Sequence, residues 1–124
     1  MLSPTKKKYL FTIYELGSEG NEVRSIDIAN SLKVKKATVY NMIELFVKSG
    51  YVEKEFRGTI KLTELGAKLG NDLYTKYLFI NRFLSEKLNS NAEDARLDSI
   101  ICLCNFTNDN IEHMIEACSA NLTE

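Results

Sequence analysis

Four residues near the carboxyl end have the types and the spacing of a divalent metal site. Carboxylate and imidazole groups are ligands of Mn²⁺, Fe²⁺ and Zn²⁺, and residues three or four positions apart share one face of a helix. The candidate ligands are Asp109, Glu112, His113 and Glu116. The simpler alternative, which we favour, is that the lone histidine is an exposed helical residue.

Three cysteines, Cys102, Cys104 and Cys118, could instead form a thiol site for a soft metal or a redox sensor. The first two lie two positions apart in a helical segment, so their side chains point about 200° apart. An odd number of cysteines among helical neighbours favours reduced, buried thiols over disulfides. We therefore expect no disulfide and leave a redox role open.

Other function classes find little support in the sequence. The 124 residues are too few for a TIM barrel, and there is no glycine-rich phosphate loop, Cys-His arrangement or recognisable carboxylate pair. The apolar runs at residues 77–80 and 100–104 are far shorter than the ~20 residues of a membrane span. The first residues lack the pattern of a signal peptide. We expect a cytoplasmic protein that is not an enzyme and has no membrane partner.

The net charge of −1 conceals two unlike halves. Residues 1–62 carry eleven basic and seven acidic side chains, a charge of +4, whereas residues 63–124 carry five basic and ten acidic ones, a charge of −5. Lys33, Lys35 and Lys36 precede a predicted helix, whose N-terminal N–H groups and dipole also attract phosphate. This placement favours a nucleic-acid partner over a merely solvated turn.

The elements that position these lysines are predicted helices. Apolar periodicity and capping residues indicate helices at 4–16, 24–32 and 37–49. The third has a buried stripe at helical spacing, formed by Val39, Met42, Ile43 and Phe46. A short helix, a tight turn and a longer helix are typical of a helix-turn-helix.

A predicted hairpin follows the third helix. Residues 51–56 and 59–62 alternate apolar and charged side chains, and Arg57-Gly58 between them is a turn signal. The predicted fold class is therefore mainly α: a winged helix-turn-helix with a two-stranded wing over residues 1–62, followed by an α-helical dimerisation lobe.

The outward face of the third helix could reach base edges in a major groove, and the wing could reach the backbone. Asn41 can pair with adenine through two hydrogen bonds, and Thr38 can bond a base or a phosphate. Tyr40 suits a phosphate or a sugar. The predicted DNA contacts are Lys35, Lys36, Ala37, Thr38, Tyr40, Asn41 and Arg57.

Residues 63–124 are predicted to form a helical dimerisation domain. Thr63 caps a helix of roughly 25 residues, which is longer than a small lobe needs, and helices at 92–104 and 108–121 follow. Core packing within one chain could explain the apolar face of any one of these helices. The large number of apolar residues on the three helices together favours a two-fold homodimer. The predicted interface residues are Leu73, Tyr77, Ile80, Leu84, Ile111, Ile115 and Cys118.

Five segments carry a family resemblance. They are residues 9–16, Ile26-Asp27-Ile28-Ala29, Val39 with Met42-Ile43, Gly50-Tyr51-Val52 and Leu62-Thr63-Glu64-Leu65-Gly66. Over about residues 5–88 the chain resembles the iron- and manganese-dependent repressors of the DtxR/MntR family. The resemblance implies a winged helix with a dimerisation lobe, a palindromic operator, and a divalent metal at the junction of the two lobes.

The positions at which the resemblance places metal ligands hold unsuitable side chains. They fall at Lys8, Phe11, Tyr77 and Asn81, and at about Ile100, Leu103 and Cys104. An ammonium group, a phenyl ring and aliphatic chains cannot ligate a divalent ion. We therefore expect lost or altered metal dependence and name no cofactor. One hypothesis is that the charge of Lys8 replaces the charge of the ion and holds the lobes together.

Together these features predict a transcriptional regulator, of the repressor type, that binds palindromic double-stranded DNA as a homodimer. The alternative is a winged-helix module that binds another protein rather than DNA. The acidic second half and the isoelectric point of about 5.9 support that alternative.

Overall fold

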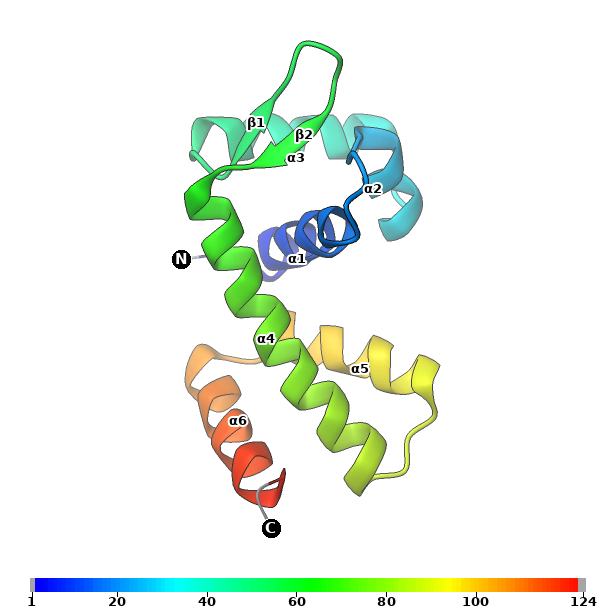
Figure 1. The fold of residues 1–124 in the computed structure, drawn as a ribbon, viewed down its shortest axis with the longest axis vertical. Coiled ribbons are helices and arrows are strands. Elements are labelled where there is room, and N and C mark those ends of the chain that lie inside the picture. Colours follow the sequence, from blue (N-terminus) through cyan, green and yellow to red (C-terminus); the bar gives the residue numbers. More distant parts are fainter. Residues whose placement is uncertain (1, 123–124) are drawn as a thin grey trace.

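The computed structural model describes residues 2–122, which form six helices and one two-stranded hairpin (Figure 1). In chain order the elements are α1 (Pro4–Ser18), α2 (Ser25–Leu32), α3 (Lys36–Lys48), β1 (Val52–Lys54), β2 (Ile60–Leu62), α4 (Glu64–Lys87), α5 (Ala92–Asn105) and α6 (Asn108–Leu122). We call α1 through β2 the amino lobe, and α5 and α6 with the second half of α4 the carboxyl lobe. Within residues 2–122 no helix is both long and apolar enough to cross a membrane.

Capping residues decide where α1 begins. The Ser3 hydroxyl oxygen accepts a hydrogen bond from the N–H of Lys6 at 3.2 Å, and Pro4 occupies the first helical position, where no N–H donor is needed. The helix runs to Ser18, slightly past the predicted end. Residues 9–13 are buried and form the centre of the amino lobe.

The helix-turn-helix forms as predicted, with helix ends within one residue of those expected. Helix α2 stops at Lys33, whose φ of 56° turns the chain into the left-handed region and toward α3. The predicted stripe of α3 is confirmed, because Val39, Ile43 and Phe46 are completely buried and Met42 is half-buried. This packing leaves the other face of α3 to solvent.

The wing is a short antiparallel hairpin in which Val52 lies opposite Leu62. Gly58 has a φ of 84°, a conformation that residues with a side chain rarely adopt, and it closes the turn. The N–H of Ile60 also donates to the carbonyl oxygen of Val23 at 2.7 Å. This added bridge ties the start of β2 to the segment before α2.

Glycines bring the start of α4 close to the amino lobe. A Cβ at Gly66 would lie 2.0 Å from the carbonyl oxygen of Tyr51, and one at Gly70 would lie 2.8 Å from the Cβ of Tyr14. Leu65, the apolar residue beside Gly66, is 48% exposed. The close approach requires the glycine face to turn inward, and Leu65 therefore points outward.

Most of the side chains predicted to face a second subunit are buried within a single chain. Five of them are at most 7% exposed: Leu73, Tyr77, Ile80, Ile111 and Cys118. The other two, Leu84 and Ile115, are half-buried against the same core. Leu73, Tyr77, Ile80, Ile111 and Cys118 thus have little surface left for a second subunit, because α4, α5 and α6 already cover it, and the interface stays a prediction.

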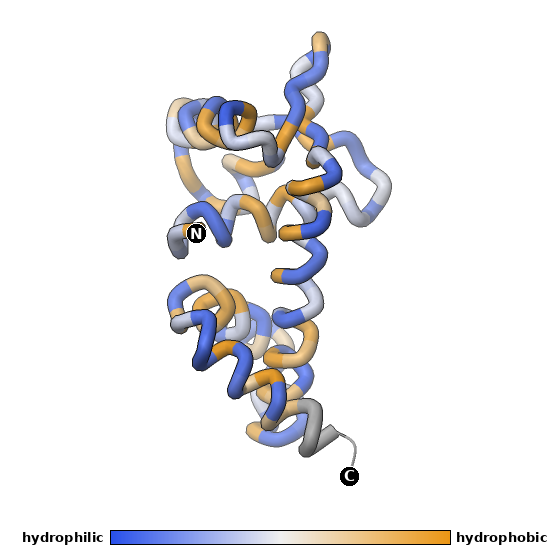
Figure 2. The backbone as a smooth tube through the Cα atoms, turned by 90° about the vertical axis from the view of Figure 1, so that its left-hand side faces the viewer, coloured by the Kyte–Doolittle hydropathy of each residue, from blue (hydrophilic) through white to orange (hydrophobic). Residues whose placement is uncertain are grey.

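Helix α4 belongs to both lobes. It contacts α1 and β2 through its first half and packs against α5 and α6. Figure 2 shows the two lobes one above the other, with α4 running along both. The predicted division into residues 1–62 and 63–124 therefore cuts the chain at the N-cap of a shared helix, and residues 123–124 of the second range lie outside the described residues.

Replacing Gly66 by alanine is expected to destabilise the fold by about 1–3 kcal/mol, because the added methyl group would overlap the Tyr51 carbonyl. Gly17→Ala is the matched control. Its methyl group would meet Val23 at 3.7 Å, an ordinary contact, so the helix propensity of alanine should maintain or raise stability. Urea unfolding of both variants beside the parent measures the difference. A Gly66→Ala variant as stable as the parent would contradict this account of the packing.

Candidate nucleic-acid interface and lobe junction

The start of α3 presents a continuous polar surface. Every residue predicted to contact DNA is exposed: Lys35, Lys36, Ala37, Thr38, Tyr40, Asn41 and Arg57. Lys35 is the N-cap of α3, and its side chain makes no capping hydrogen bond. The surface at the start of α3 therefore has a positive potential. The first N–H groups of the helix and the two lysines both contribute to it.

Tyr40 is tied to the wing by a residue that the sequence analysis missed. The Nζ of Lys54, on β1, lies 4.6 Å from the centre of the Tyr40 ring and 3.9 Å from a carboxylate oxygen of Glu44. A cation over an aromatic face is attracted by the ring quadrupole. The contact fixes Tyr40 between α3 and the wing, and the only sequence signal for it was a lysine in an alternating strand.

The wing tip is held by Arg24, a second residue that the sequence analysis did not single out. A guanidinium N–H of Arg24 donates to the carbonyl oxygen of Arg57, and the same group lies 3.6 Å from a Glu22 carboxylate oxygen. Beside Arg57, the ring of Phe56 is fully exposed. The tip thus offers one cation and one unpacked aromatic ring, on a hairpin that extends away from the rest of the chain (Figure 2).

An aromatic cluster joins α1 to α4 at the junction of the lobes. The ring of Phe11 lies 5.1 Å from that of Tyr77 and 5.9 Å from that of Tyr74, between ring centres. Tyr14 extends the cluster, with its ring 5.7 Å from Tyr74 and its hydroxyl donating to Asn71 Oδ1 at 2.8 Å. These separations are those of favourable aromatic pairs.

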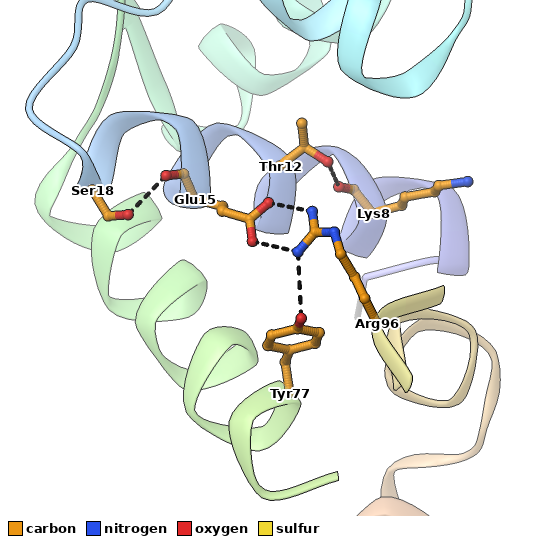
Figure 3. A network of polar contacts seen from close by, with 6 residues as sticks. All are labelled: Lys8, Thr12, Glu15, Ser18, Tyr77 and Arg96. Carbon is orange, nitrogen blue, oxygen red and sulfur yellow. Dashed lines mark hydrogen bonds and ion pairs between the residues drawn. The ribbon is translucent and has the colours of Figure 1, made fainter. Parts of the chain in front are cut away.

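A charged network lies against that cluster (Figure 3). The two guanidinium nitrogens of Arg96, on α5, donate to the two carboxylate oxygens of Glu15, on α1, at 2.6 and 2.8 Å. One of them also donates to the hydroxyl oxygen of Tyr77, on α4, at 3.3 Å. The hydrogen bonds to Glu15 raise the pKa of Arg96, although partial burial opposes the shift, so the guanidinium stays charged. We call Arg96, Glu15 and Tyr77 the Arg96 clamp.

The same region does not fit a divalent metal. Phe11 is buried in the aromatic cluster, Tyr77 binds Arg96 through its hydroxyl, and Leu103 is an aliphatic core residue. Cys104 and Asn81 are the positions with a thiol or an amide oxygen, and burial raises the pKa of the Cys104 thiol to about 11. Phe11, Tyr77 and Leu103 thus lack the carboxylate and imidazole groups that are the usual ligands of Mn²⁺ and Fe²⁺.

The alternative site near the carboxyl end is not assembled either. Nowhere in residues 2–122 does the structure bring three His, Cys, Asp or Glu side chains together as a candidate metal site. Glu112 instead pairs with Lys76 at 3.0 Å, and Lys76 also pairs with Asp72 at 3.0 Å. Burial lowers the pKa of Lys76, but the hydrogen bonds to the two carboxylates outweigh it and leave the pKa raised. The helix face of Asp109, Glu112, His113 and Glu116 thus contributes an ion pair to the fold.

The hypothesis that Lys8 holds the lobes together is not supported by the contacts of its side chain. Lys8 is exposed, and its ammonium group forms no ion pair with any residue in the described range 2–122. Its carbonyl oxygen accepts a hydrogen bond from the Thr12 hydroxyl within α1. Arg96 carries the charge that crosses between α1 and the carboxyl lobe.

Helix-turn-helix, wing and lysine-rich helix start together define a winged-helix protein of the nucleic-acid-binding class. The family model for the iron dependent repressor, N-terminal DNA binding domain, matches residues 1–59. The HTH-type transcriptional regulator MntR of Bacillus subtilis (strain 168) is 32% identical over 85 residues, which are 68% of this chain and 59% of that protein. Residues 1–59 thus match the DNA-binding domain of the iron dependent repressors, and the chain as a whole is DtxR/MntR-like.

Solved structures extend the likeness to nearly the whole chain. The crystal structure of T. acidophilum IdeR matches with a TM-score of 0.79 and 26% identity, over 96% of this chain and 56% of that one. The manganese regulator SloR, at 23% identity and a TM-score of 0.75, shares the fold. The relatives are transcriptional regulators, and this chain spans 59% of the length of the B. subtilis protein.

The three thiols are expected to be inert in the folded protein. Cys104 and Cys118 are buried and Cys102 is half-buried, all three are free, and burial raises the pKa of each, to about 11 for Cys104. Since the thiolate is the nucleophile, iodoacetamide at pH 8 should label Cys104 at least about 100-fold more slowly in the native protein than in urea. Mass spectrometry of timed samples measures the rates. Fast native labelling of Cys104 would restore the thiol-site hypothesis.

Proposed function

We propose that this protein is a transcriptional regulator, of the repressor type, that binds double-stranded DNA in the cytoplasm. The observation that carries the proposal is the exposed start of α3, where Lys35 and Lys36 flank the helix N-terminus and Asn41 lies on the outward face. Lysines at a helix start bind phosphates, and an amide side chain on the next turn can read adenine. The wing then adds Arg57 to the same basic half of the molecule.

We further propose that the chain acts as a homodimer on a palindromic site. The residues predicted for the interface are largely buried, but α5 presents other apolar side chains. Leu97 is 52% and Ile101 is 53% exposed, and the two lie one helical turn apart. An apolar pair on the carboxyl lobe suits a self-complementary contact that leaves both α3 helices free for adjacent half-sites.

The third part of the proposal is that DNA binding does not require a bound divalent metal. No carboxylate or imidazole ligand is supplied at the junction by Phe11, Tyr77 or Leu103. The side chain of Lys8 is itself positively charged. The support is the chemistry of these side chains, because an ammonium group and aromatic rings cannot replace carboxylate or imidazole ligands.

Lys36→Ala is expected to weaken binding to all duplexes alike, because Lys36 contacts phosphate. The slope of log Kd against log salt should fall by about 0.9, the value for one phosphate that the protein no longer neutralises. Asn41→Ala should instead change the preference among sequences, with a cost of about 1–3 kcal/mol on the preferred site and little cost on random DNA. Fluorescence anisotropy with a selected duplex and a scrambled one, over a salt series, measures both effects.

Lys87→Ala is the matched control, since Lys87 is an exposed lysine at the far end of α4. It should leave both affinities and the salt slope unchanged. If Lys36→Ala and Asn41→Ala reduced affinity equally on the selected and scrambled duplexes, the division between phosphate contact and base contact would be wrong. Absence of salt-dependent binding to any duplex would reject the proposed function.

Phe56→Ala is expected to weaken DNA binding by roughly tenfold, because an exposed ring beside Arg57 can pack against sugars or enter a minor groove. Folding stability should stay within about 0.5 kcal/mol of the parent, since the ring is fully exposed and packs against nothing. Anisotropy and urea unfolding measure the two quantities. Unchanged affinity would remove Phe56 from the interface, and reduced stability would show that it packs.

A further inference from the structure

The Arg96 clamp is the charged link between α1 and α5 across the junction of the lobes. Its three residues come from α1, α5 and α4, and 81 positions separate Glu15 from Arg96. A planar guanidinium that donates to both oxygens of one carboxylate has a defined orientation as well as a charge. The clamp therefore constrains how α5 lies on α1, beyond holding the two helices near each other.

Shelter from solvent strengthens this link. The side chain of Glu15 is 20% exposed and that of Arg96 is 43% exposed, while Tyr77 is 7% exposed. The guanidinium also lies 5.9 Å from the centre of the Tyr77 ring, where the aromatic face attracts a cation. Near the other end of α1, Lys7 Nζ donates to Asn108 Oδ1 at 3.0 Å, an exposed contact with a neutral partner. Of these two links to the carboxyl lobe, the clamp is the ion pair and the more sheltered.

We propose that Arg96, Glu15 and Tyr77 fix the orientation of the carboxyl lobe on the amino lobe. In this proposal the contact among the three side chains holds the two lobes together, and no metal ion at the junction is needed to do so. Arg96 and Glu15 are positioning residues: they touch no DNA and act through the placement of α3. The inference rests on the proposed function, because the orientation of the lobes affects DNA binding only if two chains bind one duplex at the same time.

The consequence for DNA follows from geometry. Two recognition helices in a dimer must reach half-sites about one helical turn apart at the same time. If the lobes of each chain move relative to each other, the second half-site contact is made at a lower effective concentration. Loosening the clamp should therefore weaken binding to a complete site while leaving binding to a single half-site unchanged.

The experiment compares Arg96→Ala with the double charge exchange Glu15→Arg/Arg96→Glu. The exchange reverses the ion pair. The carboxylate then placed at position 96 can accept a hydrogen bond from the Tyr77 hydroxyl. Arg82→Ala is the matched control, because Arg82 pairs with Glu86 at 3.0 Å within α4 and links no lobes. Affinity is measured on a duplex that the parent selects from random sequences and on one isolated half-site.

Arg96→Ala should reduce affinity for the complete site by about tenfold or more, with unchanged half-site affinity, and the charge exchange should recover most of that affinity. Arg82→Ala should behave like the parent. Excess EDTA or MnCl₂ should alter parent affinity less than the 5–150-fold typical of allosteric effectors. The proposed role of the clamp would be contradicted if Arg96→Ala reduced affinity equally for the complete site and the half-site. It would also be contradicted if the charge exchange did not recover the affinity.

Amide hydrogen exchange of the full chain without DNA separates failure of the clamp from failure of the proposed function. In Arg96→Ala the amides of α5 and of the second half of α1 should exchange faster than in the parent, with no change in Arg82→Ala. Unchanged exchange in Arg96→Ala would overturn the inference whether or not the protein binds DNA. Faster exchange in a protein that binds no duplex would support the clamp and reject the proposed function.

Discussion

The position of α1 between the two lobes is the constraint on which the rest of the structure depends. One face of α1 buries Leu10 and Ile13 in the amino lobe core. Phe11 and Glu15 lie toward α4 and α5. Because one rigid helix serves both cores, any change in how the carboxyl lobe sits on α1 is transmitted to the helix-turn-helix and to the exposed start of α3.

Helix α4 complements α1 by close packing. Gly66 and Gly70 let its backbone approach Tyr51 and Tyr14, and its second half then forms the spine of the carboxyl lobe. Close contacts of this kind have little capacity to adjust, since protein interiors are packed as densely as organic crystals. The two lobes are therefore joined by a shared helix without a flexible linker, and the Arg96 clamp adds a contact of defined geometry between α5 and α1.

The junction is held by packed aromatic rings and by the ion pair between Arg96 and Glu15. A bound ion and an ion pair both neutralise charge between two elements, but the ion requires ligand atoms at several positions. Here Phe11 and Tyr77 fill those positions with rings that pack on each other, and Arg96 supplies the positive charge from α5. An arginine stays charged over the whole accessible pH range, so such a link does not depend on the supply of a metal.

The sequence by itself determined the helix-turn-helix, the wing and the solvent-exposed side of α3, because these depend on capping residues, turn residues and apolar periodicity within short segments. It also showed which side chains at the junction could not ligate a metal. Only the tertiary structure decided that Arg96 rather than Lys8 carries the charge between the lobes, since Glu15 and Arg96 are 81 residues apart. It likewise decided that Leu73, Tyr77 and Ile80 belong to the core of one chain. Periodicity shows which face of a helix is apolar, but what covers that face depends on how distant helices pack.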